Sequence, residues 1–248
     1  MPYIVCWPVL LPWFGACAVD GMDFIAGEIL AFDKPYKWTS FDVVGKVRWL
    51  LCHRLNCKKL KVGHTGTLDP LATGVVVVCT GKKTKQINEL QNHDKEYVAT
   101  LQLGATTPSF DLEKPIDATY PTSHINRALI DSVLPSFLGE QWQVPPMFSA
   151  VKVDGKRAYE LARKGEEVEL TPKLLVIDEL EVLRFDPQTM QLEIRVVCSK
   201  GTYIRALARD IGVKLGSGAH LIALRRTRVG DIRVEDCMNF EQFTAIIE

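Results

Sequence analysis

The stretch that most constrains this chain is GHTGTLDPLATG at residues 63–74, which runs directly into the apolar segment VVVVC at residues 75–79. Three glycines in twelve residues, with no apolar run between them, are typical of a shaped loop rather than of a helix or strand. Pro70 disfavours the α conformation at Asp69 and leaves that residue extended. The β-branched run after Gly74 predicts a buried strand. We therefore expect a loop that presents the Asp69 carboxylate, with the His64 imidazole nearby, from a rigid support.

The composition is that of an ordinary globular protein. The chain has 248 residues, of which 47% are hydrophobic and 24% charged, so it can bury a core as one large domain or two small ones. Lysine plus arginine and aspartate plus glutamate are equal at 30 each, which excludes a globally basic nucleic-acid binder. A nucleic-acid partner would have to meet local basic clusters instead. Three clusters occur, the first two flanking the loop: Lys58, Lys59 and Lys61; Lys82, Lys83 and Lys85; Arg225, Arg226 and Arg228.

The cysteines and the first residues bear on the location of the protein. Seven scattered cysteines without a C-x-x-C pair support neither a zinc ribbon nor a redox motif, and indicate reduced thiols in a cytosolic protein. Residues 1–21 are mostly apolar, but they contain prolines and lack the basic start of an export signal. The segment is also short for a membrane span. We interpret it as a non-core extension from an upstream start codon, so that Met22 begins the functional, cytoplasmic protein.

Hydrophobic periodicity predicts more strands than helices. Alternating or β-branched runs indicate strands, and apolar residues at helical spacing indicate helices, the first capped by Thr39 or Ser40. The acidic region 105–122 is interpreted as an insert or loop. Without regular βαβ alternation, we expect an α+β fold with a mixed, largely antiparallel central sheet and flanking helices. The predicted strands are 27–32, 75–79, 95–104, 174–185, 192–198 and 219–229; the predicted helices include 43–51, 84–90, 125–134, 159–164, 202–215 and 241–247.

Four further segments stand out beyond the loop: Lys95-Glu96-Tyr97; Ser149-Ala150-Val151-Lys152 with Gly155 and Tyr159; Ser199-Lys200-Gly201-Thr202-Tyr203-Ile204-Arg205; and Leu224-Arg225-Arg226. Together with the Asp69 loop, these ordered segments resemble the TruB family of RNA pseudouridine synthases. The resemblance covers nearly all of residues 24–240. It implies the pseudouridine synthase catalytic fold over residues 22–248. Family members often carry a C-terminal PUA domain, which we expect this chain to lack.

The resemblance implies a role for each matching residue. Asp69 is the implied nucleophile, Arg205 the cation that keeps it ionised, and Tyr97 the aromatic ring that stacks on the target uracil. Tyr203 and Arg205 would share one face of a strand but would diverge at a helix start. The resemblance implies no metal and no cofactor. Conversion of uridine to pseudouridine is a redox-neutral isomerisation, and the sequence has neither a P-loop nor a dinucleotide fingerprint. The residues implied to contact substrate or RNA are His64, Tyr203, Leu224, Lys34 and Lys152.

The reaction implied by the resemblance is the isomerisation of one uridine in the TΨC arm of transfer RNA (position 55) to pseudouridine. The base must leave its stack before its link to the sugar can be moved from N1 to C5. The sequence leaves open whether Asp69 attacks the base or the sugar. We expect a monomer that binds the tRNA TΨC stem-loop, with no membrane and no obligate protein partner.

The residues alone also allow other functions. Asp69 and Pro70 are compatible with an ordinary turn whose carboxylate bonds only to nearby amides. A glycoside or nucleoside hydrolase would use Asp69 with a second carboxylate, which the loop does not contain. A non-catalytic RNA-binding module would not require Asp69, Tyr97 and Arg205 together. A guide-RNA-dependent relative would be expected to carry the additional domain.

Overall fold

The computed structural model describes residues 21–153, 155–166 and 168–248 of the chain. The predicted non-core extension, residues 1–21, therefore lies outside the described residues except for Gly21. Across the described ranges, no helix combines the length and the apolar character needed to cross a bilayer.

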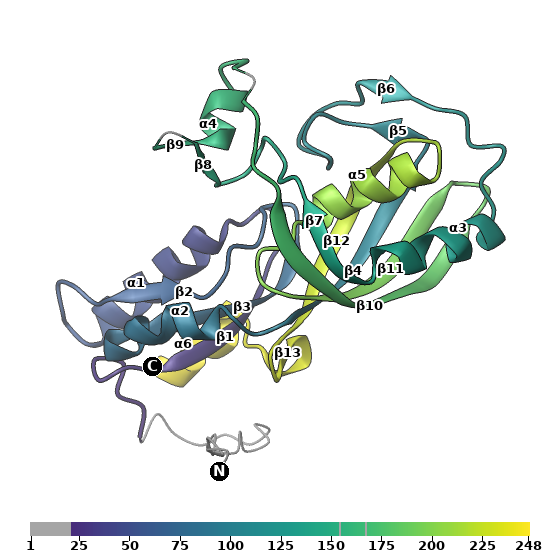
Figure 1. Ribbon diagram of the computed structural model, residues 1–248. Helices are drawn as coiled ribbons and strands as arrows, with labels where there is room; N and C mark the ends of the chain where they lie inside the picture. Colours follow the sequence, from purple (N-terminus) through teal and green to yellow (C-terminus); the bar gives the residue numbers. More distant parts are fainter. Residues whose placement is uncertain (1–20, 154, 167) are drawn as a thin grey trace, which may run out of the picture.

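One nine-stranded sheet organises the described chain (Figure 1). Its strands pair antiparallel except for β3 and β12, which run parallel over a short stretch. This confirms the predicted mixed, largely antiparallel sheet. In spatial order the strands are β1 (Ile29–Lys34), β3 (Thr73–Thr80), β12 (Ala219–Val229), β4 (Lys95–Leu103), β11 (Gln191–Cys198), β10 (Lys173–Asp186) and β7 (Gly139–Gln143), with β2 (Val62–His64) beside β3 and β13 (Ile232–Arg233) beside β12.

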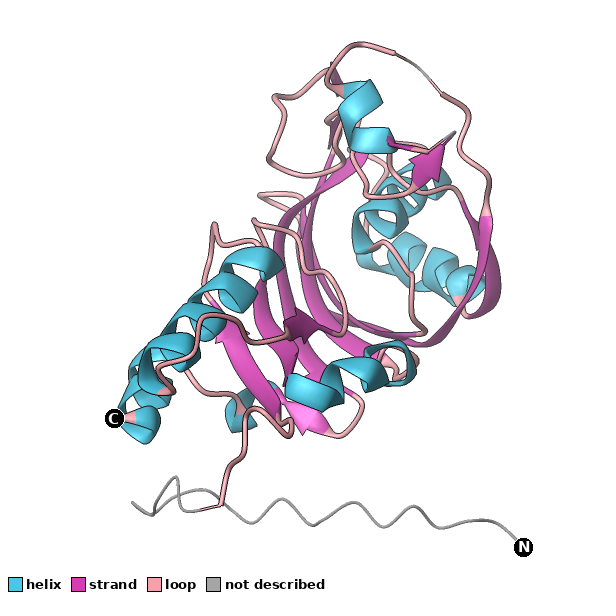
Figure 2. Cartoon of the chain, turned by 90° about the vertical axis from the view of Figure 1, so that its left-hand side faces the viewer, coloured by secondary structure: helices cyan, strands magenta, loops and turns pink. Residues whose placement is uncertain are grey.

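Helices pack against both halves of the sheet (Figure 2). In one half α1 contacts β1 and β3 with α6 beside it, and in the other half α5 runs along β12 where the sheet curls. Apolar side chains from these helices and from the strands form the main core. The helices are α1 (Ser40–Arg54), α2 (Ile87–Leu90), α3 (Arg127–Val133), α4 (Ala158–Ala162), α5 (Ile204–Lys214) and α6 (Phe240–Ile247), with 3-10 turns at Gly81–Gln86, Leu134–Phe137 and Val234–Asp236.

Helix α1 begins where the sequence predicts. The Thr39 hydroxyl accepts a hydrogen bond from the Asp42 N–H at 3.0 Å, and the Asp42 carboxylate accepts one from the Thr39 N–H at 2.7 Å. This reciprocal cap satisfies N–H groups that the start of a helix leaves unpaired. The predicted apolar face is confirmed, since its five residues are all buried: Val43, Val44, Val47, Leu50 and Leu51.

The parallel contact between β3 and β12 depends on a glycine. Gly74 has a φ of +107°, and a Cβ at this position would lie 2.1 Å from the carbonyl oxygen of Arg226. Only glycine permits both this conformation and this close approach. The approach brings Arg226 of β12 next to the end of the 63–74 loop, where its side chain can reach the loop backbone.

Several segments differ from the expectations, beginning with the predicted loop 63–74, whose two ends belong to β2 and β3. The helix predicted at 84–90 is instead a 3-10 turn, Gly81–Gln86, followed by the single turn α2. The 105–122 region contains a small hairpin, β5 (Ala105–Thr106) and β6 (Ala118–Thr119). Strand β7 is not predicted, since GEQWQ lacks apolar alternation and gains its conformation by pairing with β10 at the sheet edge.

A second hairpin lies apart from the sheet. It consists of β8 (Lys152–Val153) and β9 (Lys156–Arg157), which continues into α4. In Figure 1 the hairpin and α4 project from the top of the molecule.

Candidate active site

The loop between β2 and β3 is held by buried polar side chains. Ser40, at the start of α1, accepts a hydrogen bond from the Leu68 N–H at 2.8 Å and donates one to the Leu68 carbonyl oxygen at 3.2 Å. The buried Arg226 guanidinium donates to the carbonyl oxygens of Gly66 at 3.2 Å and Thr67 at 3.4 Å. Because these bonds end on main-chain atoms, they define the path of the backbone just before Asp69.

Lys34 supports the loop just after Asp69. Its side chain is fully buried, and its ammonium group donates to the carbonyl oxygens of Trp38 at 2.6 Å, Pro35 at 3.1 Å and Pro70 at 3.4 Å. Burial lowers the pKa of Lys34 to about 8, and the Asp69 carboxylate opposes this shift. The sequence suggests a contact between Lys34 and the substrate, but alternation along β1 turns this charge inward, beneath the loop.

Asp69 and Arg205, 136 residues apart in the sequence, form an ion pair. Arg205 Nε donates to Asp69 Oδ2 at 2.8 Å; the Asp69 side chain is 36% exposed and that of Arg205 only 5%. Within the described part of the chain, Oδ1 of Asp69 has no hydrogen-bond partner. The guanidinium stabilises the negative charge at this distance. The pair therefore presents an accessible carboxylate with one oxygen held and the other free.

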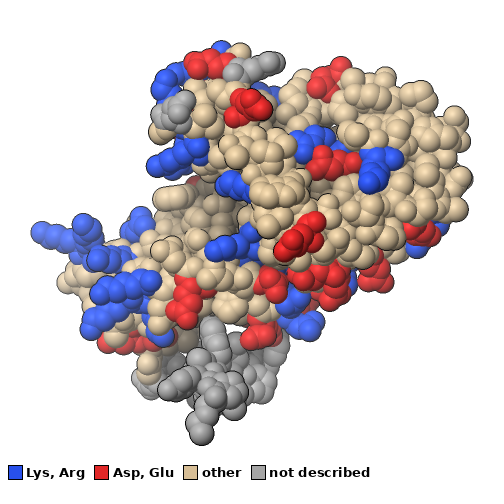
Figure 3. Space-filling view, viewed as in Figure 1, with Lys and Arg blue, Asp and Glu red and all other residues tan. Residues whose placement is uncertain are grey.

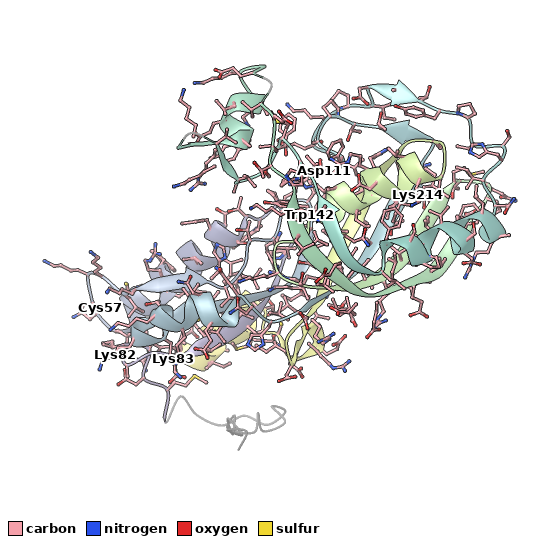
Figure 4. All side chains as sticks on the ribbon, viewed as in Figure 1. Cys57, Lys82, Lys83, Asp111, Trp142 and Lys214 are labelled. Atoms are coloured by element: carbon pink, nitrogen blue, oxygen red, sulfur yellow. The ribbon has the colours of Figure 1, made fainter. Side chains whose placement is uncertain are left out.

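A second carboxylate, absent from the predicted site, shares Arg205. Asp111 Oδ2 lies 3.6 Å from Arg205 Nε, and its side chain is nearly buried. The two terminal nitrogens of the guanidinium donate to the carbonyl oxygens of Ser109 at 3.1 Å and Phe148 at 3.0 Å. Figure 4 labels Asp111 in the upper part of the molecule, beside α5, the helix that carries Arg205. With all three nitrogens engaged, Arg205 cannot turn away from Asp69 without breaking buried contacts.

A weak sequence signal marks Asp111. Thr107, Ser109 and Asp111 occur at alternate positions and are all buried. The hydroxyl groups of Thr107 and Ser109 donate to the Asp111 carbonyl oxygen at 2.7 and 3.3 Å. The period of two is that of a strand, but small polar side chains carry no apolar pattern, so the sequence indicates only a loop here.

The two carboxylates and Arg205 line a shallow pocket whose other wall is apolar. The apolar residues include Leu71, Leu221 and Leu224. Leu224, predicted to line the site, thus lies in the same pocket as Asp69. A few charged groups facing an apolar wall suit a planar ring with polar edges. Among the described residues, no three His, Cys, Asp or Glu side chains are grouped so that they could hold a metal ion.

Two tyrosines lie close to this pocket. Tyr97 is buried on β4, opposite Arg226 of β12; burial raises its pKa above the usual 10, and the Arg226 charge opposes the shift. Tyr203 directly precedes α5, so Tyr203 and Arg205 lie at a helix start. Burial raises the pKa of Tyr203 as well, with Asp69 adding to the shift and Arg205 opposing it. Both hydroxyl groups therefore keep their proton at neutral pH.

Gln143, buried at the end of β7, holds the start of α5. Its Oε1 accepts a hydrogen bond from the Tyr203 N–H at 2.9 Å, and its Nε2 donates to the Tyr203 carbonyl oxygen at 3.2 Å. The same carbonyl oxygen accepts the first bond of α5, from the Leu207 N–H at 3.0 Å. A helix start leaves such N–H groups unpaired, so Gln143 replaces a local cap and orients Arg205 two residues later. Nothing in the sequence near Gln143 indicates this partner.

His64 and Lys152 occupy different surroundings. The half-buried His64 ring meets the Phe41 ring edge to face, with centroids 5.9 Å apart. Burial and the Arg226 charge lower the pKa of His64, so the ring is neutral at pH 7. Its Nδ1 is buried and has no hydrogen-bond partner within the ranges that the structure describes. Lys152 is exposed on the projecting β8–β9 hairpin, away from the pocket-lining residues.

In the basic cluster at residues 225–228, each arginine contacts another part of the protein. Arg226 is buried beneath the loop. Arg225 pairs with Asp33 through Nη2 and Oδ2 at 2.7 Å, and Arg228 donates to the Gly230 carbonyl oxygen at 2.8 Å. All three arginines therefore have partners within the protein. Arg225 lies beside the 63–74 loop and Arg226 lies beneath it.

Two protein-family models match the chain. The model described as "TruB family pseudouridylate synthase (N terminal domain)" matches residues 53–204, and the model described as "tRNA pseudouridylate synthase B C-terminal domain" matches residues 205–248. The chain belongs to the TruB family of pseudouridylate synthases. Membership confirms the resemblance inferred from the five segments and makes this chain an enzyme of the pseudouridine synthase class.

Two relatives are similar to this chain over most of its length. A protein of Phocaeicola vulgatus named "tRNA pseudouridine synthase B" is 66% identical over 90% of this chain and 94% of its own length. One of the same name from Flavobacterium johnsoniae is 50% identical over 89% and 96%. A chain in the solved structure "Crystal Structure of a Cbf5-Nop10-Gar1 Complex" is 30% identical, with a TM-score of 0.66 over 90% of this chain. This chain spans 54% of that longer one, so the likeness concerns about half of it.

Proposed function

We propose that this enzyme isomerises a uridine in the TΨC arm of transfer RNA (position 55) to pseudouridine, with Asp69 as the nucleophile. The proposal rests chiefly on the ion pair between Asp69 and Arg205: an accessible carboxylate on a braced loop, 2.8 Å from a buried guanidinium, at the edge of a pocket. The relatives named "tRNA pseudouridine synthase B" support tRNA as the substrate. The choice of the TΨC arm follows from the family resemblance.

The reaction exchanges one bond for another. The N1–C1′ bond breaks, the uracil turns, and a C5–C1′ bond forms; a proton leaves C5 and one is gained at N1, so the mass of the RNA does not change. The base first leaves its stack and enters the pocket between Asp69 and Leu224. Oδ1 of Asp69 attacks, while Arg205 holds Oδ2 and stabilises the charge. Attack on the base and attack on the sugar require the same free oxygen.

Other residues act on the flipped nucleotide. Tyr97 stacks on the uracil, and burial keeps its hydroxyl group protonated at neutral pH. The hydroxyl oxygen accepts the proton from C5 while its own proton passes to water, and water supplies the proton gained at N1. Neutral His64 contacts the RNA that leaves the stack, and Tyr203 closes the pocket. Lys152 on the projecting hairpin meets RNA phosphates, whereas Lys34 braces the loop. The enzyme acts as a cytoplasmic monomer without an obligate protein partner.

Chemical mapping of pseudouridine in a tRNA transcript incubated with the purified protein tests the proposal. We expect modification of one uridine in the TΨC arm, and none with Asp69→Asn. Asparagine keeps the size of the side chain without the nucleophilic charge, and RNA binding should change little because phosphate contacts dominate affinity. Turnover of Asp69→Asn within about tenfold of the parent would refute the nucleophile assignment, because loss of a covalent nucleophile costs far more.

Asp111 raises hydrolysis as an alternative, because a hydrolase needs a second carboxylate near the first. Asp111 is nearly buried and lies against Arg205, however, which suits an anchor better than a general acid. Product mass separates the two reactions: isomerisation leaves the RNA unchanged in mass, whereas hydrolysis releases free uracil. Uracil release in step with RNA modification would establish hydrolysis instead.

A further inference from the structure

Two lysine-rich turns that are separate in the sequence meet at one end of the sheet. β2 pairs with β3 so that Val62 lies opposite Thr80. Beyond this pair, the Gly81 N–H donates to the Lys61 carbonyl oxygen at 2.9 Å. The turn before β2 therefore lies against the turn after β3, and their side chains form one group, here called the lysine ridge: Lys58, Lys59, Lys61, Lys82, Lys83 and Lys85.

The positive charge of the lysine ridge is not neutralised by the protein. Five of the six side chains are exposed and Lys83 is partly exposed. None of the six forms an ion pair with a carboxylate among the described residues. In Figure 3 blue side chains gather at the left end of the molecule, where Figure 4 labels Lys82 and Lys83. A chain with equal numbers of acidic and basic residues thus concentrates uncompensated charge at one end.

The lysine ridge and the candidate active site lie at opposite ends of the same strands. β3 runs for eight residues from Thr73, at the end of the loop, to Thr80, beside the ridge. At about 3.3 Å per residue this is roughly 25 Å. A nucleotide bound in the pocket cannot also reach the ridge. On a helical RNA stem, this separation corresponds to several base pairs.

We propose that the lysine ridge binds the phosphate backbone of the substrate RNA on a helical stem several base pairs from the target nucleotide. The inference rests on the proposed function. Lysine ammonium groups on flexible stems act as point charges toward phosphates, without the fixed fork by which arginine recognises a base edge. The contact therefore adds affinity for RNA that extends beyond the target stem-loop and leaves the chemical step unchanged.

The test replaces four exposed lysines in three variants. One double variant is Lys58→Gln with Lys59→Gln, the other is Lys82→Gln with Lys85→Gln, and the fourfold variant combines them. The matched control is Arg184→Gln with Lys214→Gln, two exposed cations of the other half of the molecule, where Figure 4 labels Lys214. Each protein is assayed on full-length tRNA and on a short hairpin that contains only the target stem-loop. The dependence of tRNA affinity on salt is measured in parallel.

With full-length tRNA, we expect the fourfold variant to raise KM at least tenfold at unchanged kcat. The slope of log Kd against log salt concentration should fall by about three, since each lost phosphate contact removes about 0.7–0.9. On the short hairpin, the fourfold variant and the parent should have equal kcat and KM. The control pair should match the parent on both RNAs, although it loses as much charge as either lysine pair.

Several outcomes would overturn the inference. One is a fourfold variant with the parent's KM and salt dependence on full-length tRNA, and another is an equal loss on tRNA and on the hairpin. Lysine-dependent binding to vesicles containing phosphatidylserine, with KM for tRNA unchanged, would assign the ridge to a membrane surface instead. Failure of the parent to modify either RNA would count against the proposed function itself, which separates the two proposals.

Discussion

Substitution of Gln143 tests whether the start of α5 positions Arg205 for catalysis. Gln143 makes two hydrogen bonds to the main chain of Tyr203, two residues before Arg205. Gln143→Leu removes both bonds and leaves the Tyr203 N–H without a partner. A hydrogen bond within a protein contributes about 0.5–1.5 kcal/mol, so loss of both bonds should lower the free energy of unfolding by about 1–3 kcal/mol. A small displacement of Arg205 should lower kcat by about tenfold to a hundredfold, while KM for tRNA changes little.

Gln143→Glu provides a readout that loss of stability alone would not produce. At neutral pH the carboxylate still accepts from the Tyr203 N–H but cannot donate to the Tyr203 carbonyl oxygen. A protonated carboxyl group supplies both a donor and an acceptor, as the amide does. Burial and the facing carbonyl raise the pKa of this glutamate in the folded state above the ordinary value of about 4.3. The folded state then binds the proton more tightly than the unfolded state does. The stabilisation is therefore fully present below the unfolded pKa and is lost as pH rises through the folded pKa.

The assay measures kcat, KM and urea unfolding for both variants between pH 5 and 8, relative to the parent at each pH. Gln141→Leu is the control, because Gln141 lies on the same strand but its side chain donates to the Leu138 and Ser136 carbonyl oxygens, outside the site. A Gln143→Leu variant that loses stability but keeps kcat within twofold of this control would refute a positioning role. Absence of recovery of Gln143→Glu at acid pH would refute the hydrogen-bond explanation.

Three further substitutions test the support of the site. Asp111→Asn should lower kcat at least tenfold and the free energy of unfolding by about 1–3 kcal/mol, measured by single-turnover kinetics and urea unfolding; an unchanged kcat would mean that Arg205 needs no second carboxylate. Tyr97→Phe should bind RNA normally and turn over at least about 10²-fold more slowly, the scale of a lost acid–base group; near-normal turnover with an inactive Tyr97→Leu would leave stacking alone. In the parent, the free energy of unfolding should rise between about pH 8 and 9, and Lys34→Met should make this rise smaller. Urea unfolding at each pH measures the difference. The folded pKa of Lys34 is about 8 and the unfolded value about 10.4, so the unfolded state binds more protons and stability increases with pH, by up to about 1.4 kcal/mol per unit. Burial also lowers the pKa of Lys95 to about 8, and this lysine contributes equally to the parent and to Lys34→Met. Equal slopes of stability against pH in the two proteins would contradict the burial of an ionised Lys34.

Local patterns in the sequence were enough to predict most elements. The cap at Thr39, the buried face of α1 and the bounds of β12 at Ala219 and Val229 all follow from signals contained in a few neighbouring residues. The loop containing Asp69 was recognisable for the same reason, since its glycines and Pro70 restrict the backbone directly. Strand β7 was not, because its conformation comes from pairing with β10 rather than from its own residues.

Patterns among neighbouring residues are sufficient to predict the α+β class and the loop that contains Asp69. The groups that contact Asp69 from distant segments depend instead on how the chain packs. The bond from Arg205 to Asp69 spans 136 residues and the bonds from Gln143 to Tyr203 span 60, so strand order and register set these partners. The structure also decided that Lys34 turns inward while Lys82 stays exposed. A buried charge is tolerated where main-chain oxygens replace water, and no local pattern reveals where three carbonyl groups will converge.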